Sequence, residues 1–423
     1  MQEYWEQIEN RDKLERGMFL ILPLKYEEKN GFRDVSVIGK QIPFESNDFI
    51  EMMQEKCRAD GDFVRRYQLD IELSPIQMNS QIRVDDLQLF VFYNGVAFLS
   101  VYLAFQNGAA DSVYEFIYPG YLSEPQKVKE TQMSFLREIE DKVLRCIKPE
   151  MHWFISDKRG QGIILKEAYQ MNVAYVPNRF KNTESLKQIT YNEHRIIDLA
   201  RDFEDCSEKD VEYVTGAKDV DSGDYGWGCS VTSQEISFVY AQRDIPLTLR
   251  AAEDLLLTML VVYQKYSCLM FNEEINQRHM TGKGKGKFQK TIQELKWEAM
   301  EFITYGTLAS SQISRWNNVC EIYRLLLEMN GVQETIDEIK DKIGLLNEEQ
   351  ERIDSKRENV IGMIIAVFGL VSIVASVLQI VDYVSTGRPD MLISFFLSSA
   401  GVLVFGILLF VIYLMKKKHK GDV

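Results

Sequence analysis

The region from Val319 to Val381 constrains this chain most, because a regular apolar spacing runs directly into a long uncharged segment. Apolar residues recur at alternating intervals of three and four, which is the heptad pattern of a packed or supercoiled helix. The apolar positions are Ile322, Leu325, Met329, Val332, Ile336, Ile339, Ile343, Leu346, Ile353 and Val360. At about 1.5 Å per residue, a helix over this region would be roughly 95 Å long. We therefore predict one continuous stalk helix that leads into a membrane.

Two segments are long enough to cross a bilayer. Val360 to Val381 contains 22 uncharged residues and Met391 to Met415 contains 25 more. Each exceeds the length needed to span a hydrocarbon core of about 30 Å. Two spans leave both ends of the chain on the same side of the membrane, joined by a turn at 382–390.

Basic residues predict which side that is. Lys356 and Arg357 precede the first span and four lysines between 416 and 420 follow the second, whereas the turn holds Arg388 as its one basic residue. The positive-inside rule places both ends in the cytoplasm. The chain opens with Met-Gln-Glu-Tyr-Trp-Glu rather than a basic cap and a short apolar run, so we expect an uncleaved two-pass anchor.

The residues before the spans predict an α+β domain. Leu87 to Leu103 holds two aromatic and β-branched runs around Asn94-Gly95, which is typical of a type I′ hairpin. Gly17 to Tyr26 is apolar enough for a buried strand, although Pro23 should place it at an edge or end it. The expected divisions are an α+β cytoplasmic domain 1–245, a helical region 246–316, the stalk helix 317–359, the first transmembrane helix 360–381, the outer turn 382–390, the second transmembrane helix 391–415 and a basic tail 416–423.

Three further segments carry predictions of local structure. Leu249 to Ile275 predicts a long buried helix, because its nearly apolar centre is too short to span a bilayer. Asp202 to Asp224 is rich in acidic residues and predicts a loop. Phe288 to Leu308 predicts a helix whose candidate core residues are Trp297, Met300, Phe302 and Ile303.

Charge and cysteine content exclude some functions. The formal net charge is −14, which argues against binding to DNA or RNA backbones because such binding needs clustered Lys and Arg. The six cysteines are scattered without a CxxC pair, which favours reduced cytosolic thiols over a zinc site. The four histidines are isolated in sequence and no complete catalytic motif is present, so we expect no enzyme and identify no cofactor.

A glycine and lysine repeat at Gly282 to Lys287 is the candidate ligand loop. Lys283, Lys285 and Lys287 alternate with glycines, which suggests contacts to phosphate. No strand leads directly into the repeat and no GK[ST] follows it, so a mobile basic loop is the alternative.

Polar and small residues form a stripe on the first predicted span, opposite the aliphatic seam. Such a stripe normally faces protein or water, because unpaired polar groups in lipid are costly. These candidate pore-lining residues are Asn359, Gly362, Ala366, Gly369, Ser372, Ser376, Gln379 and Tyr383.

The same face of the stalk is acidic. Its carboxylates are Glu334, Asp337, Glu338, Asp341, Glu348, Glu351 and Glu358. If several copies turn this face to a common axis, the carboxylates form a vestibule that concentrates cations ahead of a polar pore. Alternatively, the acidic face is the solvated side of a rod and the small residues are helix-packing contacts.

This layout resembles the CorA superfamily of divalent-cation channels and transporters. The resemblance rests on the α+β first domain, the long helix entering the first span, the short outer turn, the second span and the lysines at 416–420. It implies a homopentamer in a bacterial inner membrane, with the first span lining a pore for a divalent cation such as Mg²⁺. The Gly-Met-Asn motif of that family is missing, because 382–390 reads DYVSTGRPD, so ion selectivity does not carry over.

Other segments resemble divergent CorA-like proteins of bacterial antiviral systems, some of which accompany type III CRISPR loci. The similar segments are YQKYSCLMF, SSQISRW and EIYRLLLEM. This resemblance implies a membrane effector opened by a nucleotide second messenger that binds the cytoplasmic domain. A membrane-tethered binding module without transport is the remaining alternative.

Overall fold

The structure is a computed structural model, and it describes residues 8, 11–26, 37–119, 125–154, 165–177, 179–180, 182–201, 211–216, 225–281 and 289–386. The chain divides into two compact units, Met1–Lys342 and Ile343–Val423.

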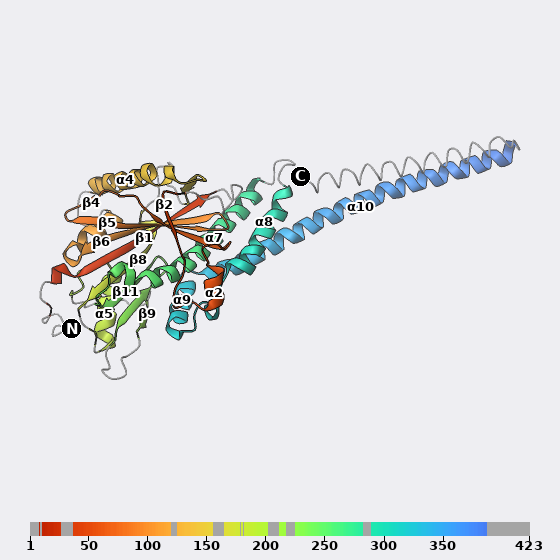
Figure 1. The fold of residues 1–423 in the computed structure, drawn as a ribbon. Coiled ribbons are helices and arrows are strands. Elements are labelled where there is room, and N and C mark those ends of the chain that lie inside the picture. Colours follow the sequence, from red (N-terminus) through yellow and green to blue (C-terminus); the bar gives the residue numbers. More distant parts are fainter. Residues whose placement is uncertain are drawn as a thin grey trace. The chain divides into compact units, whose positions relative to one another are not determined.

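The first unit is built on one mixed sheet with helices, which confirms the α+β class (Figure 1). The strands follow the order β2-β3-β5-β6-β1-β8-β11-β10-β9, with β4 paired to β5 and β7 paired to β1. Strands β8 and β11 pair in parallel, and the other pairs are antiparallel. The strands are β1 Glu15–Tyr26, β2 Gly39–Ile42, β3 Val64–Leu69, β4 Ile76–Gln77, β5 Gln81–Phe92, β6 Val96–Gln106, β7 Met151–Trp153, β8 Tyr169–Val176, β9 Glu212–Thr215, β10 Trp227–Val231 and β11 Glu235–Ala241.

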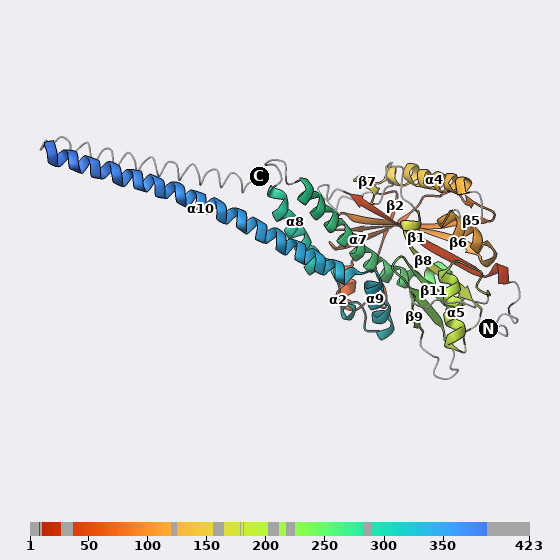
Figure 2. The same cartoon turned by 180° about the vertical axis from the view of Figure 1, so that it is seen from behind.

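Helices cover both faces of this sheet (Figures 1 and 2). On one face, Phe116 of α3 and Phe135 of α4 share a core cluster with Met18 of β1. On the other face, Tyr263 of α7 stacks on Phe92 of β5 with ring centroids 4.1 Å apart. The helices are α2 Glu51–Lys56, α3 Ala110–Ile117, α4 Pro125–Lys142, α5 Thr183–His194, α6 Leu247–Arg250, α7 Ala252–Thr281, α8 Gln289–Glu301, α9 Asn317–Met329 and α10 Val332–Thr386, with a π-helical turn at Phe302–Gly306.

Strand β1 is central and buried, so the expectation that Pro23 marks an edge or an end is wrong. β1 pairs with β6 along one side, and on its other side with β8 as far as Ile21 and with β7 from Leu24. Pro23 falls between these two neighbours, where its carbonyl accepts from the Phe154 backbone N–H at 3.0 Å. A proline is tolerated here because the missing N–H points into the interval between β7 and β8.

The β5–β6 hairpin confirms the predicted strands, but the turn is not type I′. The ladder pairs Val91 with Ala97, which leaves Asn94 at the centre of a longer connection. Gly95 has a φ of 88°, whereas Asn94 does not have a positive φ. A type I′ turn needs positive φ at both central residues, so this geometry is that of a three-residue loop closed by glycine.

Tertiary contacts also overturn two expectations drawn from composition. The acidic stretch 202–224 was expected to be a loop, yet Glu212–Thr215 forms β9 and pairs with β10. Trp297 and Met300 were candidate core residues, but they are 71% and 44% exposed, whereas Phe302 is fully buried. The predicted buried helix over Leu249 to Ile275 is confirmed by α7, which runs from Ala252 to Thr281.

The predicted uninterrupted helix from Val319 is broken at Asn330–Gly331, within the expected stalk 317–359. Helix α9 ends at Met329, and α10 begins at Val332. Gly331 has a φ of 60°, and its N–H donates to the Glu328 carbonyl at 2.9 Å. Glycine in the left-handed conformation commonly ends a helix. The heptad pattern continues across Asn330–Gly331, so it did not indicate that the helix ends there.

Helix α10 contains one segment long and apolar enough to cross a membrane. This segment is Glu358–Val381, 24 residues with a mean hydropathy of 2.7, and none of it is covered by the rest of the described chain. Such exposure of large aliphatic side chains favours a membrane environment. The predicted second span at 391–415 and the basic tail lie outside the described residues.

Asp254 offers a test of how α7 packs on the sheet. Its carboxylate accepts a hydrogen bond from the Tyr240 hydroxyl at 2.6 Å. Burial raises the pKa of Asp254 to about 6, above its ordinary value of 3.8. Because the folded pKa exceeds the unfolded one, this group stabilises the fold most at low pH, and that contribution is lost as the pH rises through 6.

We expect Asp254→Asn to remove the pH dependence of stability that comes from Asp254, while the amide oxygen of Asn still accepts a hydrogen bond from the Tyr240 hydroxyl. Between pH 4 and pH 7, the free energy of unfolding of the variant should rise relative to wild type by up to about 3 kcal/mol. Urea denaturation of both proteins across this pH range measures the difference. A constant difference at every pH would contradict the assigned pKa.

Candidate functional site

The predicted pore-lining residues lie on one helix. Asn359, Gly362, Ala366, Gly369, Ser372, Ser376 and Gln379 all belong to α10, and their spacing puts them on a common face. The Ser376 hydroxyl donates to the Ser372 carbonyl at 2.8 Å, so its donor is satisfied within the helix. Tyr383 also belongs to α10, but its side chain lies outside the described residues.

The predicted vestibule carboxylates are exposed on the same helix. This holds for Glu334, Asp337, Glu338, Asp341, Glu348, Glu351 and Glu358. Asp337 pairs with Lys340 at 2.8 Å, and Glu338 pairs with Lys342 at 2.6 Å. The hydrogen bond from Lys340 lowers the pKa of Asp337, and that from Lys342 lowers the pKa of Glu338. Part of the acidic charge is therefore offset by lysines on the same helix.

The apolar seam is covered at the start of α10. Val332, Ile336 and Ile339 are buried within the first unit, whereas Asp337 and Asp341 on the opposite face are exposed. The apolar seam in this part of the stalk is therefore buried by residues of the same chain, and it does not need a second copy to cover it. The acidic face is the one left available to solvent or to other copies.

The candidate ligand lysines Lys283, Lys285 and Lys287 lie outside the described residues. A groove that sequence reasoning missed lies elsewhere in the first unit, with a volume of about 1160 Å³. Strand β7, the end of α4 with the turn that follows it, Lys25 of β1 and one face of α7 form its walls. Its residues come from three separate stretches of the chain, Lys25, 140–154 and 269–273, so no local sequence motif indicates it.

The groove combines aromatic and charged side chains. Trp153 and Phe154 provide ring surfaces, and the Trp153 indole N–H donates to the Glu140 carboxylate at 2.6 Å, which fixes the ring. Three cations and three carboxylates also line the groove: Lys25, Arg145, Lys148, Glu140, Glu150 and Glu273. This mixture suits a small ligand that carries an aromatic ring, hydrogen-bond donors and an anionic group.

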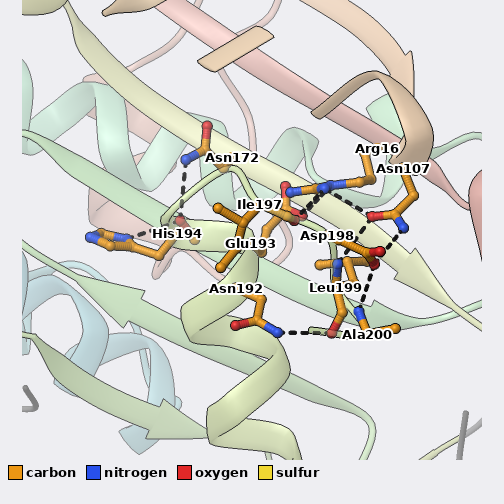
Figure 3. Close-up of polar contacts among 11 residues, drawn as sticks. Arg16, Asn107, Asn172, Asn192, Glu193, His194, Ile197, Asp198, Leu199 and Ala200 are labelled. Carbon is orange, nitrogen blue, oxygen red and sulfur yellow. Dashed lines mark hydrogen bonds and ion pairs between the residues drawn. The ribbon is translucent and has the colours of Figure 1, made fainter. Parts of the chain in front are cut away.

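A second polar assembly lies between α5 and the sheet, and the ion pair at its centre is fully buried (Figure 3). Arg16 of β1 donates through Nε to Glu193 Oε2 at 2.7 Å, and through Nη1 to Asn107 Oδ1 at 3.0 Å and the Ile197 carbonyl at 2.8 Å. Arg16 and Glu193 are both 0% exposed. Burial raises the pKa of Glu193, and the Arg16 guanidinium opposes that effect. The network fixes α5 and the segment after it to the central strand.

His194 has no other histidine or catalytic motif near it in sequence, but in the structure its imidazole contacts two polar side chains. Its Nδ1 lies 3.0 Å from Ser237 Oγ and its Nε2 lies 2.9 Å from Glu235 Oε1, an arrangement with the residue types of a hydrolytic triad. Ser237 is 0% exposed, and Asn172 also donates to its hydroxyl. A nucleophile needs access to substrate, so this cluster contributes to packing in the structure as it stands.

Among the residues that the structure describes, no group of three or more His, Cys, Asp or Glu side chains is placed to hold a metal ion. No protein-family model, no curated protein and no solved structure matches this chain.

The buried network predicts a large cost for losing one partner. Arg16→Met leaves the Glu193 carboxylate in the core without its cation, so we expect the free energy of unfolding to fall by about 3–5 kcal/mol. Denaturation of the detergent-solubilised full chain in urea provides the measurement.

Arg58→Met is the matched control, because Arg58 pairs with Asp60 at 3.1 Å on the surface, with both side chains more than half exposed. That pair should be worth no more than about 1 kcal/mol. An equal fall in the free energy of unfolding in the two variants would contradict the prediction that the buried Arg16 pair contributes more to stability than the exposed one.

Proposed function

We propose that this chain is a CorA-like homo-oligomeric channel or transporter for cations in a bacterial inner membrane. In this proposal the first unit is cytoplasmic, α10 supplies the first span, and 391–415 supplies the second. Both termini then lie in the cytoplasm. The transported ion is a cation, with Mg²⁺ as the first candidate by resemblance.

The proposal rests on α10 being one helix that is charged in its first part and apolar in its second. From Val332 to Thr386 it carries exposed carboxylates first and then the uncovered apolar segment Glu358–Val381. A helix that passes from charged to apolar in this way is suited to lead from water into lipid. Because the backbone N–H and C=O groups inside a helix bond to one another, such a segment needs no backbone partners from the bilayer.

The polar face of α10 supports a pathway rather than a simple anchor. Gly362, Gly369 and Ser376 recur at intervals of seven residues, and Ser372 and Gln379 lie beside them. A stripe of polar and small side chains on a membrane helix normally faces protein or water, because polar groups in lipid are costly. Facing a common axis, these side chains would line a narrow polar passage, with the carboxylates of the lower part of α10 attracting cations.

The proposal requires several copies. Two spans in one chain do not enclose a passage, and the resemblance to CorA proteins implies a pentamer. A mass measurement of the detergent-solubilised complex tests this requirement. A monomer would support the remaining alternative, a membrane-tethered binding module without transport.

Substitutions on the polar stripe test the pathway. Gly369→Leu and Ser376→Leu should each reduce cation entry into liposomes at least fivefold, because a large aliphatic side chain would occlude a narrow passage. Val374→Leu, on the aliphatic seam of the same helix, is the control and should leave entry within twofold of wild type. Unchanged flux in both stripe variants would contradict the pore assignment.

A nucleotide-gated membrane effector of a bacterial antiviral system is the second candidate function. The groove favours it, because Trp153 can stack on a base while Lys25, Arg145 and Lys148 provide cations for phosphates. The two functions differ in what opens the pathway. Flux without any added ligand supports constitutive cation transport, whereas flux that appears only with a nucleotide supports the effector.

Binding measurements test the groove directly. A fluorescent adenine nucleotide should bind the full-length protein, and Trp153→Ala or Lys148→Ala should weaken its Kd at least tenfold by removing a stacking surface or a cation. Trp316→Ala is the control, since Trp316 is 51% exposed and lies outside the groove. Binding that is equally strong in Trp153→Ala would place the ligand elsewhere.

A further inference from the structure

Helix α7 contacts both the groove and the start of α10. Leu269 and Glu273 of α7 line the groove. Lys265 and Asn272 of the same helix make hydrogen bonds to the α9–α10 region. Positions 265, 269 and 272 are spaced i, i+4 and i+7, so they fall on one face of the helix. The groove wall and the contacts to α10 are therefore neighbours on α7.

Lys265 ties the sheet to the joint between α9 and α10. Its ammonium group donates to the Ser233 carbonyl in the β10–β11 turn at 2.6 Å and to Asn330 Oδ1 at 2.9 Å. Burial lowers the pKa of Lys265 to about 8. A cation that is held in a partly buried place by two acceptors is costly to leave unpaired, so both contacts are expected to persist or to be lost together.

The joint itself is short and open. Asn330 caps α9 and donates to the Leu326 carbonyl at 2.8 Å, and Gly331 follows in the left-handed conformation. The nearest atom to a side chain added at Gly331 would be 3.9 Å away, so the glycine is unconfined. One further contact follows, where Lys342 of α10 donates to Asn272 Oδ1 at 2.9 Å.

We propose that α7 transmits occupancy of the groove to α10. Leu269 is 42% exposed, so a ligand in the groove contacts it directly. Displacement of Leu269 shifts Lys265 and Asn272, which adjoin it on α7, and releases Asn330 and Lys342. The first turns of α10 then pivot at Asn330–Gly331. This inference rests on the groove being the effector site of the second candidate function.

A covalent filler tests the coupling without a known ligand. Leu269→Cys is made in a full-length background of Cys146→Ser, Cys206→Ser and Cys320→Ser, and is labelled with fluorescein maleimide in detergent. The remaining thiols, Cys57, Cys229 and Cys268, are buried, and burial raises the pKa of each, so they should not react. Hydrogen exchange of the amides at 332–342 is then measured by mass spectrometry.

We expect labelling to accelerate exchange at 332–342 at least threefold. Lys265→Met without label should produce most of this acceleration, and labelling that variant should add less than labelling the protein that keeps Lys265, because one of the two contacts is already lost. Asn272→Ala gives a second, milder variant that should produce part of the effect. The same label at Lys129→Cys, on the exposed side of α4, is the control and should leave exchange unchanged.

Two results would overturn the coupling: unchanged exchange after labelling at 269, or effects of label and Lys265→Met that multiply as independent changes do. The exchange measurement does not depend on ion flux or nucleotide binding. If exchange changes as expected while no flux is seen, the coupling stands and the channel proposal fails. If flux responds to nucleotide while exchange does not, the proposed function stands and α7 is not the route.

Discussion

The constraint on which the rest depends is the apolar surface of α10 between Glu358 and Val381. No described part of the chain covers it, and in water such a surface would drive aggregation. Such a surface favours a bilayer or contact with other copies of the chain. This is why we propose an oligomeric membrane protein, and the polar stripe within the segment is why we propose a conducting assembly rather than a plain anchor.

The first unit contains two groups of polar side chains, and they differ in how accessible they are to a ligand. The Arg16 and Glu193 ion pair of the network has no exposed surface, so its role is to hold α5 to β1. The groove beside Trp153 is open to solvent and mixes rings with charges of both signs. A buried ion pair is closed to a ligand, whereas an accessible groove with aromatic and charged side chains suits one. For this reason we propose the groove, and not the network, for ligand binding.

The break at Asn330–Gly331 changes how the stalk should be understood. A single rigid rod from Val319 would have passed any motion of the first unit directly to the membrane. Helix α9 ends at Met329 and α10 starts at Val332, and Lys265 contacts the joint between them through Asn330. A short joint with a glycine in the left-handed conformation is a better place for regulation than a continuous helix.

The sequence by itself determined the α+β class, the hairpin strands, the buried α7 and the apolar segment of α10, because each depends on local periodicity and composition. It also contained the signal for the helix end, Asn330-Gly331, which the heptad pattern outweighed. Tertiary structure alone decided that Pro23 sits in a central strand, that 212–215 joins the sheet, and that Trp297 is exposed. It also brought together Trp153, Lys25 and Leu269 into a groove, and His194 with Ser237 and Glu235. Those associations join residues far apart in the chain, so no spacing along the sequence records them, and only the packing of α7 and α5 against opposite faces of one sheet creates them.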